Sequence, residues 1–229
     1  MRRGDAWVSP RHVVSTDMAP ARIGSETVNR GKRRATDRHG LSIPDGSWPL
    51  ARAAEGPLER VRRFVNTVNR ENGADRLHQA VDLRCWLDNE GWAVTGRVDS
   101  AAVHRTHRLR GALHAMAVAN QSGASPSREL ADFAREVPVV LTFGEVPSVQ
   151  PQRGGIDVFF AKVLGIVFAS MLDESWLRLK ACANPHCQWV IYDRSKNRSV
   201  IWCADEACGN RARSRAHRLR QARDSAATI

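Results

Sequence analysis

The spacing of apolar residues predicts that a helix begins near residue 57. Pro57 stands where helices favour their first turn, and apolar residues then recur at the intervals of one helical face, as Val61, Phe64, Val65 and Val68. The segment "ENGADRL" ends this pattern with Asn72 and Gly73. We therefore expect the helix to bury this face and to stop before Gly73.

Three further segments carry the same helical spacing. The first covers residues 80–91 and is expected to bury Val81, Trp86 and Leu87 before it stops at Gly91. The second covers about 100–120, with its inward face formed by Val103, Leu109, Leu113 and Met116. The third covers 125–136, where a Ser start is followed by Glu129.

The pattern then changes from helical spacing to a short β element. The run "VPVVLTF" predicts a strand, Gly144 a turn, and "VPSV" a returning strand. A long apolar helix follows over residues 155–172. These elements predict a mainly α fold with a small β element, of the α+β class.

The chain divides into three parts and a short tail. Residues 1–56 have little apolar periodicity and predict a disordered basic extension. Residues 57–175 hold the helices described above, 176–224 hold a cysteine-rich module, and 225–229 form the tail. The run "NRGKRRATDRHG" in the extension fits a nucleic-acid-binding arm or a solvated tail, and Met18 offers an alternative start.

From the distribution of apolar residues we expect neither a signal peptide nor a membrane span. The N-terminus is basic but lacks the apolar core of a signal sequence. The most apolar segment, Ile156 to Leu172, is interrupted by Asp157 and Lys162, whereas a span needs about 20 apolar residues. We expect a cytoplasmic protein, associated with the nucleoid when it is bound to DNA.

Four of the five cysteines form two pairs, Cys182/Cys187 and Cys203/Cys208. Two β-prone runs, "QWVIY" and "VIW", stand between the pairs and flank the polar segment "DRSKNRS". A hairpin of these two runs would fold the pairs face to face. The sequence after Cys208 has helix-forming composition. The predicted unit is a knuckle, a β-hairpin and a helix, as in treble-clef or ribbon-type zinc modules.

The cysteine pattern predicts a metal site. A reducing cytosol favours metal over disulfides, and four thiolates complete a closed tetrahedral site for one structural Zn²⁺. Two disulfides or free buried thiols are the alternatives, and His186 is a spare candidate ligand. Cys85 lies in an apolar helix and is expected to be a small core residue.

The positive charge gathers in the cysteine module. The chain has 35 Lys and Arg against 24 Asp and Glu, and a pI near 10.6. Between Trp176 and Ile229 there are eleven basic and four acidic residues, and no acid stands from Arg211 to Arg223. An unrelieved cationic helix suits a polyanion, because each neutralised phosphate releases counterions. The predicted nucleic-acid contacts are Arg194, Lys196, Arg198, Arg211, Arg213, Arg215, Arg218 and Arg220.

Helical geometry arranges these arginines around the predicted helix. At 100° per residue, Arg211, Arg215 and Arg218 share one face. Arg213 and Arg220 lie roughly opposite. A narrow apolar stripe, expected to dock the helix, is formed by Ala212, Ala216 and Leu219.

Two blocks of the chain resemble known families. "FVNT" (64–67), with the later "LRCWLDNEGW", resembles the N-terminal ABATE domain, and the segment that ends in "CGNRARSRAHR" resembles the CGNR zinc finger that follows it. The resemblance implies a bacterial stress-related transcription regulator whose finger binds DNA. Carried over by position, the four paired cysteines are the metal ligands, and Arg211 with the arginines after it are the nucleic-acid contacts.

Two residues of the tetrad allow more than one interpretation. Gly209 directly after a knuckle cysteine would let backbone N–H groups approach the thiolate sulfur. Asn210 would cap the following helix or contact a base directly.

Three functions remain open at this stage. The first is a DNA-binding regulator on duplex DNA, and the second is an RNA- or ribosome-associated protein that uses the same surface. The third is an enzyme with its site in the helical part, where His104, His107 and His114 share one helix. No Gly-rich phosphate loop, nucleophile motif or carboxylate pair supports catalysis, so we expect no enzyme.

Overall fold

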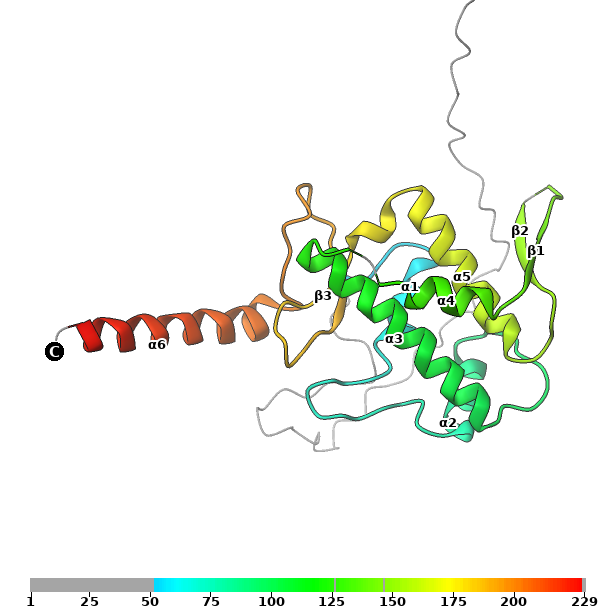
Figure 1. Ribbon diagram of the computed structural model, residues 1–229, viewed down its shortest axis with the longest axis horizontal. Coiled ribbons are helices and arrows are strands. Elements are labelled where there is room, and N and C mark those ends of the chain that lie inside the picture. Colours follow the sequence, from blue (N-terminus) through cyan, green and yellow to red (C-terminus); the bar gives the residue numbers. More distant parts are fainter. Residues whose placement is uncertain (1–51, 126, 146, 228–229) are drawn as a thin grey trace, which may run out of the picture.

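A computed structural model describes residues 52–125, 127–145 and 147–227 of the chain. The predicted basic extension lies outside this part except for residues 52–56, of which Arg52, Ala53 and Glu55 contact the cysteine module. Six helices form most of the described structure (Figure 1): α1 Leu58–Val65, α2 Ala80–Asn89, α3 Ser100–Ser122, α4 Glu129–Arg135, α5 Asp157–Leu172 and α6 Asn210–Ala227. The four strands are β1 Val139–Thr142, β2 Ser148–Pro151, β3 Leu179–Ala181 and β4 Val190–Tyr192. The prediction of a mainly α fold with a small β element is confirmed.

The helices from α1 to α5 enclose one core that is rich in aromatic rings. Phe159 of α5 stands at its centre, with ring centroids 5.1 Å from Phe64 of α1 and 4.9 Å from Trp92, both edge to face. The long α3 passes beside this core (Figure 1) and contributes the predicted inward residues, all of which are buried. Asp99 caps the start of α3 by accepting a hydrogen bond from the Ala102 N–H, and Gly123 ends it with a φ of 73°.

Several local predictions were wrong. In α2 the buried face consists of Leu83, Trp86 and Leu87, whereas Val81 is 62% exposed and Cys85 is exposed rather than buried in the core. Relative to Leu83, Val81 and Cys85 lie about 160° and 200° around the helix, which places both on the solvent side.

Two predicted helix ends also differ from the structure. Helix α1 ends at Val65, and the chain then forms a tight turn closed by a bridge between Val68 and Asp75. Helix α4 begins at Glu129 behind Arg128, without a side-chain cap from serine.

The β1–β2 hairpin confirms the predicted strand and its return. The strands are antiparallel, with Leu141 opposite Val149. Strand β2 packs on α5 at Gly165, where a Cβ atom would lie only 3.5 Å from the Val149 Cβ. The hairpin therefore forms a small arm at the edge of the helical body (Figure 1).

The strand pairing of the cysteine module differs from the prediction. "QWVIY" supplies β4 as expected, but β4 pairs with β3, which precedes the first cysteine, so that Lys180 lies opposite Ile191. The run "VIW" forms no strand; its Ile201 accepts a hydrogen bond from the Ala183 N–H at 2.9 Å. A π-helical turn, η3 (Asp205–Gly209), then leads into α6, which projects from the body (Figure 1).

None of the helices in the described part of the chain has the length and apolar character that crossing a bilayer requires.

Candidate metal centre and nucleic-acid interface

The four paired cysteines converge on one point in the module. The Sγ atoms of Cys182, Cys187, Cys203 and Cys208 all lie within 4.8 Å of one another, and three of the four residues are buried. They form no disulfide, and the Cys187 and Cys203 sulfurs are 3.7 Å apart. The alternative of two disulfides does not describe this arrangement.

The sulfur spacing fits a tetrahedral metal. Zinc–sulfur bonds of about 2.3 Å at tetrahedral angles require neighbouring sulfurs about 3.8 Å apart, close to the separation of Cys187 and Cys203. The crowding also disfavours several thiolates without a cation, because the pKa of Cys187 is raised, first by its interaction with Cys182. The donor set therefore suits a soft divalent cation and supports zinc binding.

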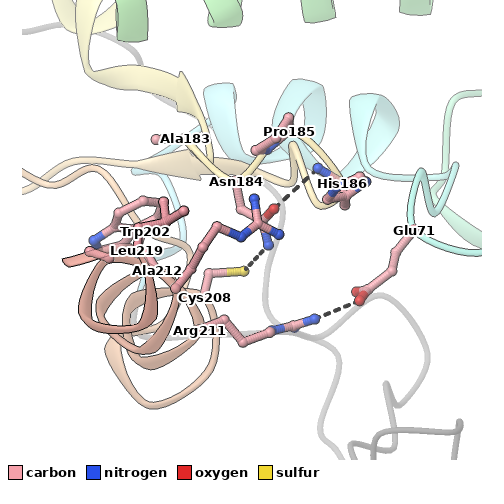
Figure 2. A pocket seen from close by; sticks show the side chains of 12 residues that line it. Glu71, Ala183, Asn184, Pro185, His186, Trp202, Cys208, Arg211, Ala212 and Leu219 are labelled. Atoms are coloured by element: carbon pink, nitrogen blue, oxygen red, sulfur yellow. Dashed lines mark hydrogen bonds and ion pairs between the residues drawn. The ribbon is translucent and has the colours of Figure 1, made fainter. Parts of the chain in front are cut away.

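Asn184 organises the first cysteine pair. Its carbonyl accepts hydrogen bonds from the Cys187 and Gln188 N–H groups, and its Oδ1 accepts one from the His186 N–H at 3.1 Å. Its Nδ2 donates to the Cys208 Sγ at 3.3 Å, which joins the first pair to the second (Figure 2). The Cys203 N–H also points at the Cys182 Sγ, at 3.5 Å. These donors stabilise thiolates and fix their orientation.

Gly209 does not bond to sulfur and Asn210 does not cap α6, while the predicted base contact of Asn210 stays a prediction. The Gly209 N–H bonds to the Ala204 carbonyl rather than to sulfur, and a Cβ atom on Gly209 would lie 3.3 Å from the Trp202 ring. Glycine is needed because Trp202 packs against the backbone here. Asn210 is the first residue of α6, and its side chain donates to the Glu206 carbonyl and accepts from Arg213 instead of capping the helix.

The polar segment between the pairs is held by one buried carboxylate. Asp193 is fully buried, and its two oxygens accept hydrogen bonds from Lys180, from Val200 and twice from Ser195. Burial alone would raise the pKa of Asp193, but the hydrogen bonds from Ser195 and Lys180 hold it below its usual value. Lys180 also donates to the Arg198 carbonyl. The loop that carries Arg194, Lys196 and Arg198 is thus fixed.

The module is bonded to the helical body through its backbone. Asn66 at the end of α1 donates to the Val190 carbonyl and accepts from the Val190 N–H, both at 2.8 Å. The buried Arg62 also reaches the Val190 carbonyl. On α3, Asn120 donates to the carbonyls of Trp176 and Leu179 at 2.9 Å. The asparagine of the motif "FVNT" therefore bonds the helical part to the cysteine module, which the sequence predicted as two separate domains.

The predicted nucleic-acid contacts fall into two groups in the structure. Four of them have partners within the protein: Arg194 with Ala53 and Glu55, Arg198 with Glu174, Arg211 with Glu71, and Arg213 with the Asp205 carbonyl and Asn210. The other four are exposed and have no such partner among the described residues: Lys196, Arg215, Arg218 and Arg220. The second group lies mostly on the projecting part of α6.

The apolar stripe of α6 does not dock on the body as predicted. Leu219 is 57% exposed, and Ala216 is exposed as well. Instead, the stripe borders a groove of about 480 Å³ between α6 and the Asn184 knuckle, beside Trp202 (Figure 2). Sequence reasoning missed the groove and its acid, Glu71, because they depend on a contact between residues 140 positions apart.

The three histidines of α3 do not form one site. His104 is exposed, whereas His107 contacts the Leu77 carbonyl at 2.8 Å. The His114 Nε2 lies 3.0 Å from both the Arg70 Nε and the Gln188 carbonyl. Because a neutral ring nitrogen either donates or accepts, only one of these two contacts is a hydrogen bond at a time. Burial first, and then Arg70, lower the pKa of His114 to about 4.

Comparison with known families covers both parts of the chain. Residues 58–155 match the ABATE model, described as "Putative stress-induced transcription regulator", and residues 178–221 match the model of the CGNR zinc finger. The first range contains Asn66 and the second contains all four clustered cysteines. A search of the curated proteins gave no match.

Proposed function

Because the chain combines an ABATE domain with a C-terminal CGNR zinc finger, we propose that it is a zinc-dependent DNA-binding transcription regulator. In this proposal one structural Zn²⁺, held by Cys182, Cys187, Cys203 and Cys208, fixes the start of α6. Four thiolates leave no open position for water or substrate, so the metal acts in folding and not in catalysis. We accordingly propose a binding protein and not an enzyme.

The observation that carries the proposal is the exposure of Arg215, Arg218 and Arg220 on a helix that projects from the body (Figure 1). Exposed arginines without acidic neighbours repel one another, which is a cost unless a polyanion neutralises them. Arginine also offers a planar fork that matches phosphate oxygens and the guanine edge.

The dimensions of α6 support duplex DNA as the partner. Its 18 residues span about 27 Å, and a helix about 10–12 Å across fits the major groove, which is about 12 Å wide. The fixed loop with Lys196 stands on the same module and offers a separate phosphate contact. Single-stranded or structured RNA would present the same charges in a different shape, which makes RNA the comparison in the test.

The test measures binding of the zinc-loaded protein to a 20-base-pair duplex and to a hairpin RNA across salt concentrations. If Arg211, Arg215, Arg218 and Arg220 contact phosphates, the logarithmic salt slope on DNA is about −3.6, or roughly 150-fold weaker binding from 50 to 200 mM salt. Each Arg→Ala variant should reduce the slope by about one. Preference for RNA at matched salt, or a slope unchanged in the variants, contradicts the proposal.

A further inference from the structure

The groove beside α6 already holds one oxyanion, and it belongs to the protein. The Glu71 carboxylate lies 2.6 Å from the Arg211 guanidinium at the edge of the groove (Figure 2). Among the described residues, this is the ion pair that joins α6 to the helical body. The pair engages Arg211 of the CGNR tetrad, whose side chain would otherwise face solvent.

Glu71 is presented by a stiff turn. The Glu71 N–H donates to the Asn69 Oδ1 at 2.9 Å, and the Asn69 N–H bonds to the Ala74 carbonyl at 2.8 Å. The turn is closed by the bridge between Val68 and Asp75, and Asp75 is paired with Arg110 of α3. Because these bonds fix the backbone of the turn, little backbone entropy is lost when Glu71 meets Arg211.

The remaining lining of the groove suits a phosphate ester. Arg215 lines it one helical turn beyond Arg211, and His186 lines it from the knuckle. Trp202 provides an aromatic surface and Leu219 an apolar one. Arginine side chains beside an aromatic surface match a nucleotide, which carries its charge on the phosphate and its flat apolar area on the base.

We propose that this groove is a phosphate subsite of the nucleic-acid surface, in which the Glu71 carboxylate occupies Arg211 until a backbone phosphate displaces it. This inference rests on the proposed function and adds that the helical domain regulates how tightly the zinc module binds nucleic acid. Any change that moves the turn of residues 68–75 alters how readily Arg211 is released. The helical domain thus sets the affinity of the zinc module without touching the nucleic acid.

The test compares two variants with the same change of charge. Glu71→Gln removes the competing carboxylate, and Glu206→Gln removes an exposed acid of the zinc module that has no ion pair among the described residues. Both weaken the general repulsion of DNA, but only Glu71→Gln frees Arg211. We expect Glu71→Gln to tighten duplex binding about 1.5- to 5-fold more than Glu206→Gln, the range of an exposed ion pair.

A double variant isolates the cause. In an Arg211→Ala background, Glu71→Gln should act no more strongly than Glu206→Gln, because the paired arginine is gone. Equal effects of the two glutamine variants in the wild-type background, or an excess that persists without Arg211, overturn the inference while the proposed function stands.

A titration with inorganic phosphate keeps the two proposals apart. Side-chain N–H signals of Arg211 and Arg215 should shift with phosphate, and at lower phosphate concentration in Glu71→Gln than in the wild type. If the signals shift while neither DNA nor RNA binds, the subsite is supported and the proposed function fails. If no signal shifts in either protein, the subsite is refuted.

Discussion

Asn66 and Val190, 124 positions apart in sequence, exchange two hydrogen bonds of 2.8 Å in the interior of the protein. The asparagine side chain acts here as a neighbouring strand would, because its amide offers one donor and one acceptor to the backbone of β4. The contact joins the motif "FVNT" of the helical part to strand β4 of the zinc module. It explains why a polar asparagine directly follows the buried Phe64 and Val65 at the end of α1.

Replacing Asn66 with Ala should destabilise the whole chain. The Val190 N–H would be buried without a partner, and its carbonyl would keep only the longer contact from Arg62. We expect a loss of about 2–4 kcal/mol in the free energy of unfolding, measured by denaturant titration at saturating zinc. Asn89→Ala at an exposed position is the control, with a change within about 0.5 kcal/mol. A loss in Asn66→Ala no larger than the control would contradict this role.

Replacing a clustered cysteine should abolish metal binding. Cys203→Ala leaves three sulfurs, and the free energy of zinc binding, about 10–16 kcal/mol in small zinc modules, is then no longer available for folding. We expect about one zinc per chain in the wild type and close to none in the variant, by elemental analysis. The far-ultraviolet helix signal should fall as α6 loses its fixed start.

Cys85→Ala is the matched control, because Cys85 is exposed on α2, outside the cluster. It should keep its zinc and its helix signal. A metal-free wild type with α6 intact would refute the metal centre.

Gly209 and Gly111 provide a matched pair for the close contact at Trp202. A Cβ atom on Gly209 would lie 3.3 Å from the Trp202 ring and 3.4 Å from the Arg213 guanidinium, whereas nothing lies within 4 Å of one on Gly111. Gly209→Ala should therefore cost about 1–3 kcal/mol through overpacking. Gly111→Ala in the middle of α3 should gain about 0.5–1 kcal/mol from helix propensity. Denaturant titration of both variants measures the change in the free energy of unfolding, which should differ in sign between them. Stabilisation by Gly209→Ala would disprove the close contact.

The features that the sequence predicted correctly depend on local spacing. The inward face of α3 follows from a period of 3.6 residues, and the cysteine cluster follows from two pairs with a polar turn between them. The exposure of Val81 and Cys85 in α2 could have been predicted in the same way, since both lie opposite Leu83 on a helical wheel.

The features that were missed depend on distant contacts. Strand β3 has only three residues, Leu179–Ala181, which is too short to show a period, and its choice as the partner of β4 depends on packing against α3. Nothing near Asn66 indicates Val190, and nothing near Glu71 indicates Arg211. The domain boundaries at 57, 176 and 225 stay a prediction, although both family matches lie within them.

The buried His114 predicts a dependence of stability on pH. Its pKa is lowered to about 4 in the folded protein, against about 6.5 in the unfolded chain. The unfolded chain therefore binds a proton first as the pH falls, and stability that is present above pH 6.5 is lost toward pH 4. Between pH 7 and pH 5 this group should reduce the free energy of unfolding by about 2 kcal/mol.

The change His114→Gln separates this effect from acid release of the metal. The glutamine amide can reach the Gln188 carbonyl but does not titrate, whereas the four cysteines are the same in both proteins. Denaturant titrations of wild type and variant at pH 7, 6 and 5, at saturating zinc, should give curves whose difference narrows or changes sign toward acid. Parallel pH profiles would contradict the prediction, because they would mean that the pKa of His114 is the same in the folded and the unfolded protein.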